Sequence, residues 1–314
     1  MSLAFVFPGQ GSQSVGMLSS WADSECVRKT FEEASGVLGY DLWSLAQQGP
    51  AEQLALTEIT QPLMLVAGVA TWRAWCEASA LRPEWVAGHS LGEFSALVAA
   101  GALEFADAVD LVRFRGEVMR DAVPNGQGGM AAILGLTDED TIRACEQAAG
   151  AEVVEAVNFN APSQVVIAGH RAALERAVEV AKQFGAKRAL LLPISVPCHS
   201  SLMQPAAEQL RERLAGVLVR PSQLRFMSSV DACEYQEPEA IRALLYRQLA
   251  SPVRWVATMQ ALVSAGVQVT VECGPGKVLT GLQRRIQRAP EHGVYALEDA
   301  GTLAMVIQTL AGQA

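Results

Sequence analysis

Short apolar runs alternate with longer helical patterns along the first third of the chain. The first run, Leu3–Phe7, breaks at Pro8, which is typical of a buried strand that enters a tight turn. The segments 24–38 and 61–79 have helical patterns, and the second is apolar on most of its faces. A further short apolar run at 85–87 predicts another strand. This alternation indicates a parallel sheet with helices on both faces.

The middle of the chain has a different order of elements. The pattern predicts strands at 130–136, 153–157, 164–168 and 189–194, helices at 139–149 and 172–184, and a turn at 160–163. The order β-α-β-β-α-β is that of a ferredoxin-like unit. We therefore predict an α/β-hydrolase-like parallel-sheet core, discontinuous over 1–126 and 195–314, with a ferredoxin-like subdomain inserted at 127–194.

The alternation of helices and strands resumes after the predicted insertion. Helices are expected near 204–216, 239–250 and 253–264, strands at 225–230 and 267–272, and two further helices at the end. These elements complete the predicted core.

Composition narrows the classes of function. Half of the 314 residues are hydrophobic, enough for a large core. A net charge of -9 argues against a nucleic-acid partner, because phosphates would be repelled. The six cysteines form no CxxC pair, so neither a zinc site nor a disulfide scaffold is indicated. The apolar stretch 63–72 is shorter than the roughly 20 residues that a bilayer requires, and we expect a cytoplasmic protein without membrane contact.

The pentapeptide 88–92, Gly-His-Ser-Leu-Gly, matches G-x-S-x-G between a predicted strand and a predicted helix. In this context Ser90 can occupy a nucleophile elbow, a sharp turn in which the flanking glycines relieve crowding. The N–H of Leu91 could then stabilise an oxyanion near the helix N-terminus. The alternative is an ordinary strand–helix turn with a capping serine.

A nucleophilic serine needs a base, and the chain has four histidines. His292 lies in a polar stretch, His170 follows a strand, and His89 is adjacent to Ser90 on a turn where neighbouring side chains diverge. His199 lies in a loop between a strand and a helix, where catalytic groups are commonly displayed. It is the best-placed candidate, although a solvated loop histidine is an equal alternative.

Arg115 is the most informative charged residue. On a helix over 105–121, its neighbours three and four positions away are all apolar: Leu111, Val112, Val118 and Met119. A guanidinium on a buried face needs an anionic partner. That partner is either an internal carboxylate or the carboxylate of a ligand, and the helix alone does not decide between them.

Gln10 lies between two glycines at the carboxyl end of the first strand, where open α/β sheets bind ligands. These glycines do not fit a dinucleotide fingerprint, because the third required position is Ser14. Lys277 follows a glycine-containing turn that lacks the leading glycine of a Walker A motif. Binding of nucleotide phosphates is therefore not indicated.

Six blocks of sequence carry a family resemblance. They are Phe7-Pro8-Gly9-Gln10-Gly11-Ser12-Gln13, Gly88-His89-Ser90-Leu91-Gly92-Glu93, Arg115-Gly116, Asn158-Phe159-Asn160-Ala161-Pro162, Pro197-Cys198-His199-Ser200 and Gln248-Leu249-Ala250-Ser251-Pro252-Val253. Together, and in this order over residues 3 to about 280, they resemble the malonyl-CoA:acyl-carrier-protein transacylases of bacterial fatty acid synthesis. The fold of that family agrees with the architecture predicted above.

The resemblance implies a role for each matching residue. Ser90 would be the nucleophile, His199 the general base and acid, and the Gln248 carbonyl would orient the imidazole. Arg115 would bind the malonyl carboxylate in a bidentate pair. The N–H groups of Gln10 and Leu91 would form the oxyanion hole, and Asn160 would lie near the substrate. Cys198 departs from the family pattern, which more often has Ser or an aromatic residue there. This departure affects the expected choice of acyl group and not the chemistry.

The implied reaction is a ping-pong transfer through a malonyl-serine ester. Its substrates would be the thioesters of CoA and of phosphopantetheine on acyl carrier protein, with no bound cofactor and no metal. A serine esterase or thioesterase would share the elbow and the histidine but would leave Arg115 unexplained. A non-catalytic scaffold would have lost the nucleophile or the base, and both are present. A transacylase of a polyketide synthase and the acyl-transfer subunit of a malonate decarboxylase remain alternatives within the class.

Acyl carrier proteins are typically acidic, so an acidic enzyme should meet them through a local basic patch. Two short basic runs stand out, Lys187-Arg188 and Arg284-Arg285. Short runs of two charges are more often solvated surface. Lys187 and Arg188 precede the strand that leads to His199, where a phosphopantetheine arm would enter, and Arg284 and Arg285 lie on the helix after Gly276. We predict that all four residues form the docking patch.

Overall fold

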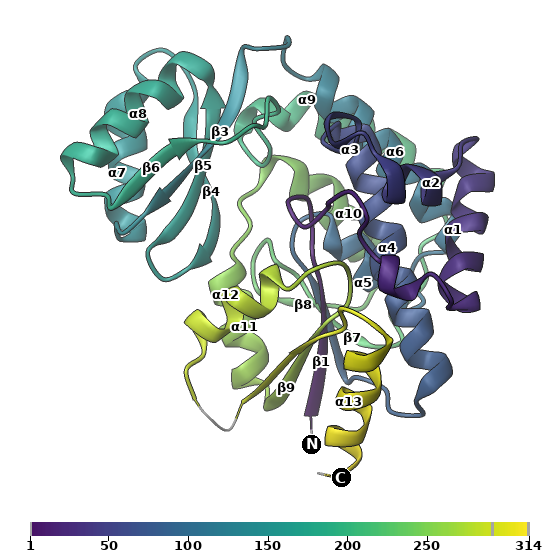
Figure 1. The fold of residues 1–314 in the computed structure, drawn as a ribbon. Coiled ribbons are helices and arrows are strands. Elements are labelled where there is room, and N and C mark those ends of the chain that lie inside the picture. Colours follow the sequence, from purple (N-terminus) through teal and green to yellow (C-terminus); the bar gives the residue numbers. More distant parts are fainter. Residues whose placement is uncertain (1, 290–291, 313–314) are drawn as a thin grey trace.

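The computed structural model describes residues 2–289 and 292–312 of the chain. Its large sheet has the strand order β10, β9, β1, β2, β7, β8: Gly293–Ala296, Val267–Glu272, Ser2–Phe7, Trp85–Gly88, Arg225–Met227 and Glu234–Tyr235 (Figure 1). The pairs along β10, β9, β1, β2 and β7 are parallel, and only β8 pairs in the antiparallel direction. The predicted parallel-sheet core is confirmed.

Alternate side chains of β1 enter two different apolar cores. Leu3, Phe5 and Phe7 pack in a core with helices of one layer: α1 Glu25–Leu38, α4 Thr57–Ala78, α5 Gly92–Ala99, α6 Phe105–Asp121, α9 Gln204–Leu214, α10 Pro238–Arg247 and α13 Ala300–Ala311. Ala4 and Val6 pack in the opposite core with α11 Trp255–Ser264 and α12 Val278–Ile286. Both faces of the strand are therefore buried, which explains its continuous apolar run.

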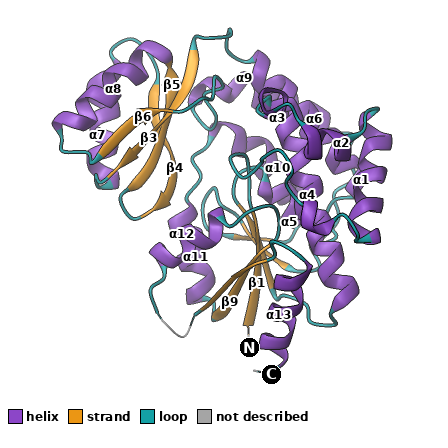
Figure 2. Ribbon diagram, viewed as in Figure 1, coloured by secondary structure: helices purple, strands orange, loops and turns teal. Residues whose placement is uncertain are grey.

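The second sheet is antiparallel, with the order β4, β5, β3, β6: Val154–Ala161, Gln164–His170, Gly128–Leu134 and Arg188–Leu191. Its apolar core includes residues of α7 Asp138–Ala149 and α8 Arg171–Gln183. Figure 2 shows this sheet and its two helices as a lobe beside the large sheet. The β-α-β-β-α-β order is the one that the sequence predicts. The exact domain boundaries, 126/127 and 194/195, remain a prediction.

Strand β4 differs from its predicted bounds because of a tertiary contact. The sequence predicts a turn from Asn160, but β4 continues to Ala161. Asn158 forms a parallel bridge with Val253 of the core, and the Phe159 N–H donates to the Val253 carbonyl at 2.9 Å. This pairing with a distant segment extends the strand and joins the lobe to the core.

Several short elements were not predicted from the sequence. They are α2 Leu42–Gln48, α3 Ala51–Leu54, strands β8 and β10, and the single-turn 3-10 helices Ser19–Trp21 and Ser201–Met203. The helix predicted near 239–250 is present as α10 and a 3-10 turn at Gln248–Ala250. Strand β6 also ends at Leu191, three residues before its predicted end, so that 192–196 is free to form a loop. No helix in the described ranges is long and apolar enough to cross a membrane.

Candidate active site

Ser90 sits at the turn between β2 and α5, with a left-handed backbone at φ 53°. A Cβ on Gly88 would lie 1.9 Å from the Gly92 carbonyl carbon, and one on Gly92 would lie 2.0 Å from the Phe7 carbonyl oxygen. Two atoms that are not bonded to each other cannot lie this close, so both positions require glycine. The turn thus has the tight packing and backbone strain of a nucleophile elbow.

His199 lies directly against this serine. Its Nε2 is 2.7 Å from Ser90 Oγ, and its Nδ1 is 3.0 Å from the carbonyl oxygen of Gln248 and 3.1 Å from that of Ser251. Carbonyl oxygens only accept, so Nδ1 carries the proton and Nε2 is free to accept one from Ser90. The structure therefore brings the serine and histidine singled out in the sequence into the geometry of a nucleophile and its base.

Burial, followed by the positive charge of Arg115, lowers the pKa of His199 from 6.5 to about 3. The imidazole is only 3% exposed. It is neutral at physiological pH, as a general base must be before it removes a proton.

The other three histidines are held elsewhere. His89 Nε2 is 2.7 Å from Asn160 Oδ1, and the Val153 N–H donates to His170 Nδ1 at 3.0 Å. His292 Nε2 lies 2.9 Å from the Thr270 hydroxyl. None of these contacts involves Ser90.

Arg115 is 1% exposed and projects from α6 into the protein. Its guanidinium donates to the side-chain oxygens of Gln61, at 2.6 Å, and Gln248, at 3.0 Å. Its Nε–H is buried and has no partner among the described residues, and no carboxylate there lies within ion-pair distance. Burial lowers its pKa to about 10, so the group stays charged at neutral pH. The internal ion pair considered from the sequence is therefore not present in the described part of the chain.

Two further buried residues complete this network, and sequence reasoning did not assign either of them a role. Gln61 lies on α4 and is fully buried. Glu93 lies on α5, is also fully buried, and accepts a hydrogen bond from the Gln248 amide. The available signals were a glutamine in a mostly apolar stretch of helix and a glutamate three residues after Ser90.

A cavity of about 910 Å³ opens in front of Ser90 and His199, between the lobe and the core. Gln10, Asn160 and Cys198 also line it. Burial raises the pKa of the Cys198 thiol to about 11, so that this side chain stays protonated beside Ser90 and His199. Leu91, Arg115 and Gln248 are buried behind the lining rather than within it.

The N–H groups of Leu91 and Gln10 take part in no hydrogen bond among those of the described residues. Gln10 lines the cavity together with Ser90, and Leu91 is the residue that follows Ser90 in the chain, so neither N–H is taken up by another acceptor in the described ranges. Asn158 also lines the cavity, and its buried Oδ1 has no partner in the described ranges. It belongs to a motif noted in the sequence but was assigned no role there.

The four basic residues predicted for docking are all exposed and lie outside the cavity lining. Arg188 on β6 pairs with Leu134 on β3, which pairs with Gln164 on β5. Arg285 on α12 hydrogen-bonds to the side chain of Gln164. Lys187-Arg188 and Arg284-Arg285 therefore lie toward the same end of the small sheet.

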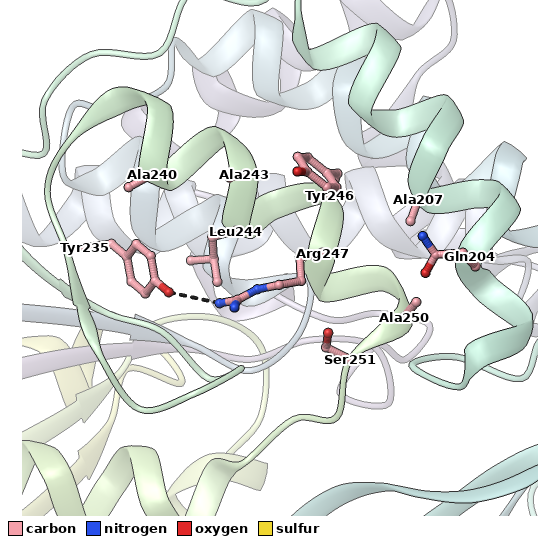
Figure 3. Close-up of a pocket in the computed structure, with 10 residues that line it drawn as sticks. All are labelled: Gln204, Ala207, Tyr235, Ala240, Ala243, Leu244, Tyr246, Arg247, Ala250 and Ser251. Atoms are coloured by element: carbon pink, nitrogen blue, oxygen red, sulfur yellow. Dashed lines mark hydrogen bonds between the residues drawn. The ribbon is translucent and has the colours of Figure 1, made fainter.

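A second cavity, of about 400 Å³, lies among α9, α10 and the segment that follows α10 (Figure 3). Its charged lining residue, Arg247, donates to Tyr235 Oη at 2.9 Å and is paired with Asp231 at 2.6 Å. It contains no nucleophile paired with a base and shares only Ser251 with the surroundings of His199. We therefore assign the serine–histidine chemistry to the first cavity and not to this one.

Within residues 2–289 and 292–312, no three His, Cys, Asp or Glu side chains gather as metal ligands would. The fold and the serine–histidine pair define an enzyme of the class that works through an acyl-serine. In agreement, the model of the acyl transferase domain family matches residues 4–303. The chain belongs to the acyl transferase domain family, and within it to the malonyl CoA-acyl carrier protein transacylases.

Several similar proteins support this membership over nearly the whole chain. The malonyl CoA-acyl carrier protein transacylase of Escherichia coli (strain K12) is 54% identical over 284 residues, covering 90% of this chain and 92% of that protein. The acyl-carrier-protein S-malonyltransferase of Burkholderia pseudomallei superposes with a TM-score of 0.95 at 53% identity, covering 98% of this chain and 100% of that one. A malonyl-transacylase solved with a type II PKS acyl-carrier protein has a TM-score of 0.96 at 48% identity and covers 98% of this chain and 100% of its own.

Proposed function

We propose that this protein transfers the malonyl group of malonyl-CoA to the phosphopantetheine thiol of acyl carrier protein, for fatty acid synthesis. Its family and the names of its relatives support the reaction. The observation that carries the residue assignment is the 2.7 Å contact between Ser90 Oγ and His199 Nε2 at the base of a large cavity.

In the first half-reaction, Ser90 Oγ attacks the thioester carbonyl of malonyl-CoA while His199 Nε2 takes the hydroxyl proton. The C–S bond then breaks, and the proton on Nε2 goes to the departing thiolate, so that CoA leaves as a thiol. The product is a malonyl-Ser90 ester. The N–H groups of Leu91 and Gln10 stabilise the negative oxygen of the tetrahedral intermediate.

The second half-reaction reverses these roles. His199 takes the proton of the phosphopantetheine thiol, whose sulfur attacks the malonyl-Ser90 ester, and the C–O bond to serine breaks. The proton returns to Ser90 Oγ, which restores the free enzyme. The Gln248 and Ser251 carbonyls hold the imidazole in one tautomer through both steps.

Arg115 binds the free carboxylate of the malonyl group. Its partnerless Nε–H supports this role, because a buried donor without an acceptor is costly until a ligand supplies one. A carbonyl rather than a carboxylate orients His199, so no negative charge lies in direct contact with the imidazole beside the substrate. Asn160, held by His89 at the wall of the cavity, contacts the remainder of the acyl-thioester.

The reaction uses only the CoA and phosphopantetheine thioesters and requires no bound cofactor or metal. We place it in the cytoplasm, where both carriers occur. Lys187, Arg188, Arg284 and Arg285 form the docking patch for the acidic carrier protein. Their common position at one end of the small sheet supports this assignment.

A second candidate is the same reaction in the service of a polyketide synthase. The relative solved with a type II PKS acyl-carrier protein favours this alternative, since it is 48% identical to the chain. The chemistry is identical, and the two differ only in the carrier protein. Rates with fatty-acid and polyketide carrier proteins from the same cell distinguish them.

The decisive experiment is intact-mass analysis after incubation with malonyl-CoA alone. We expect one malonyl group on the wild-type protein, located on Ser90 by peptide mapping, and its loss when carrier protein is added. Ser90→Ala should take up no malonyl group. A stable malonyl adduct on Ser90→Ala would contradict the assignment, and rapid hydrolysis of the wild-type adduct by water would favour a thioesterase.

A further inference from the structure

We infer that Glu93 is a positioning residue of the active site: its buried carboxylate fixes the direction of the Gln248 side-chain amide and so aims Arg115 at the malonyl carboxylate. This inference rests on the proposed function. It concerns a residue that touches neither the substrate nor the reacting atoms.

Glu93 is fully buried on the first turn of α5, three residues after the nucleophile. One carboxylate oxygen accepts from the Ser229 N–H at 2.5 Å and from the Ser229 hydroxyl at 3.0 Å. The other accepts from the side-chain amide of Gln248. The carboxylate is thus anchored on one side and bonded to the catalytic network on the other.

Gln248 lies between this carboxylate and the guanidinium of Arg115. Its Nε2 donates to Glu93 and to the carbonyl oxygen of Ser90, at 2.9 Å, and its Oε1 accepts from Arg115 at 3.0 Å. Burial raises the pKa of Glu93 to about 7, so above that pH its carboxylate is ionised and only accepts, whereas a guanidinium only donates. The amide can therefore bridge them in one direction only, with its nitrogen toward Glu93 and its oxygen toward Arg115.

The same arrangement balances charge in the empty site. Arg115 has no carboxylate in direct contact within the described ranges, and Glu93 is one amide away from it. The negative charge of Glu93 raises the pKa of Arg115, against the larger effect of burial. Glu93 therefore stabilises the buried cation while leaving its Nε–H free for a substrate carboxylate.

Gln248 also connects this network to the base. Its backbone carbonyl accepts from His199 Nδ1 at 3.0 Å, so one residue contacts both the group that binds malonyl and the group that moves the proton. A displaced Gln248 side chain should affect malonyl recognition most directly, because Arg115 loses one of its two side-chain acceptors.

The test is the substitution Glu93→Gln, which keeps the shape of the side chain and, at pH 8 where Glu93 is ionised, removes its charge. With its oxygen kept on the Ser229 N–H, the new amide would turn a donor toward the donor Nε2 of Gln248. With its oxygen on Gln248, it would turn a donor toward the Ser229 N–H and lose the anchor, so either orientation loses one of the two contacts of the carboxylate. The quantity measured is the ratio of kcat/KM for acyl-enzyme formation from malonyl-CoA to that from acetyl-CoA. Both substrates are assayed with the same enzyme preparation, so a loss of folded protein lowers both values equally and cancels in the ratio.

Glu272→Gln is the matched control. Glu272 is likewise a fully buried glutamate, but it accepts from the N–H groups of Leu279 and Thr280 at the start of α12. We expect the malonyl-to-acetyl ratio to fall about 10-fold or more in Glu93→Gln, the value of one charge-assisted hydrogen bond. The ratio should stay unchanged in Glu272→Gln, although both variants lose stability.

An unchanged ratio in Glu93→Gln, with stability lowered as in Glu272→Gln, would overturn the inference and leave Glu93 a structural residue. If Glu93→Gln yields no folded protein, Glu93→Asp keeps the charge but shortens the reach to Gln248. Its ratio should also fall, and an unchanged ratio would overturn the inference equally. A wild-type protein that forms no malonyl-enzyme would overturn the proposed function itself, which the wild-type measurement alone reveals.

Discussion

Ser90 and His199, 109 residues apart in the chain, both have left-handed backbones, at φ 53° and 67°, where their side chains meet. Left-handed φ is uncommon for residues other than glycine and is costly without compensating contacts. In this protein these two residues with a strained backbone are the ones whose side-chain atoms, Ser90 Oγ and His199 Nε2, lie 2.7 Å apart. Each backbone turns its side chain toward the other, which makes the pair dependent on the surrounding packing rather than on either loop alone.

Replacing the base should nearly abolish transfer. In His199→Ala the Ser90 hydroxyl has no acceptor for its proton, and we expect kcat to fall by about 10³-fold or more, as in other serine enzymes that lose this group. The measurement is CoA release from malonyl-CoA in the presence of carrier protein. His170→Ala, which removes a histidine bonded to the Val153 N–H, is the control and should retain wild-type activity. A His199→Ala rate within tenfold of wild type would exclude His199 as the base.

Removing Arg115 should change the choice of substrate. Only malonyl-CoA carries a free carboxylate, so Arg115→Ala should lower kcat/KM for malonyl-CoA far more than kcat/KM for acetyl-CoA. Loss of one partner of a desolvated Arg–carboxylate pair costs roughly 2–4 kcal/mol, which corresponds to a selectivity change of about 30- to 1000-fold. The ratio of kcat/KM values measures this change. Arg113→Ala, on the same helix but paired with Asp110 and Glu117, should leave the ratio unchanged. Equal losses for both substrates would instead assign Arg115 a purely structural role.

Reversing the charge of the predicted docking patch should slow the half-reaction that uses carrier protein and spare the one that does not. Changing Lys187, Arg188, Arg284 and Arg285 to Glu should raise the KM for carrier protein and make the remaining rate less sensitive to salt. Formation of malonyl-Ser90 from malonyl-CoA should be nearly unchanged, because that step does not involve the carrier. Reversing Arg171 and Lys182 on α8, which are exposed and paired with neighbours on the same helix, is the control. If both half-reactions fall together, or neither changes, the docking patch lies elsewhere.

Stability should respond to pH through His199. Its pKa is about 3 in the folded protein and near 6.5 when unfolded, so between these values the unfolded state binds one more proton. The free energy of unfolding should therefore decrease as pH falls below 6.5, by about 2 kcal/mol at pH 5 from this group. His199→Ala removes this contribution, so its stability should decline less than that of wild type between pH 7.5 and 5.

Urea unfolding at the two pH values measures this difference. Burial raises the pKa of Glu93 to about 7, which acts in the opposite direction, since stability from that group decreases as pH rises through 4.5 to 7. This contribution is present in both proteins and cancels in the comparison. Identical pH slopes for the two proteins would show that His199 is not buried as a neutral group.

Local sequence was sufficient wherever the relevant contacts are close in the chain. The elbow around Ser90 is a strand, a turn and a helix within a few residues, and its glycines are required by backbone contacts that the motif itself predicts. The burial of Arg115 followed from helical spacing, and the structure leaves it 1% exposed. The β-α-β-β-α-β order likewise followed from apolar periodicity.

Gln248 was identified only through the family resemblance, and neither Glu93 nor Gln61 was assigned a role. The local sequence around these three residues does not show what they contact. The hydrogen bonds that join them to Arg115 connect four elements between 54 and 155 residues apart. The continuation of β4 past Asn160 depended in the same way on its pairing with Val253. Periodicity reports which face of an element is buried, but the direction of a buried amide is set by the donors and acceptors that the complete fold places around it.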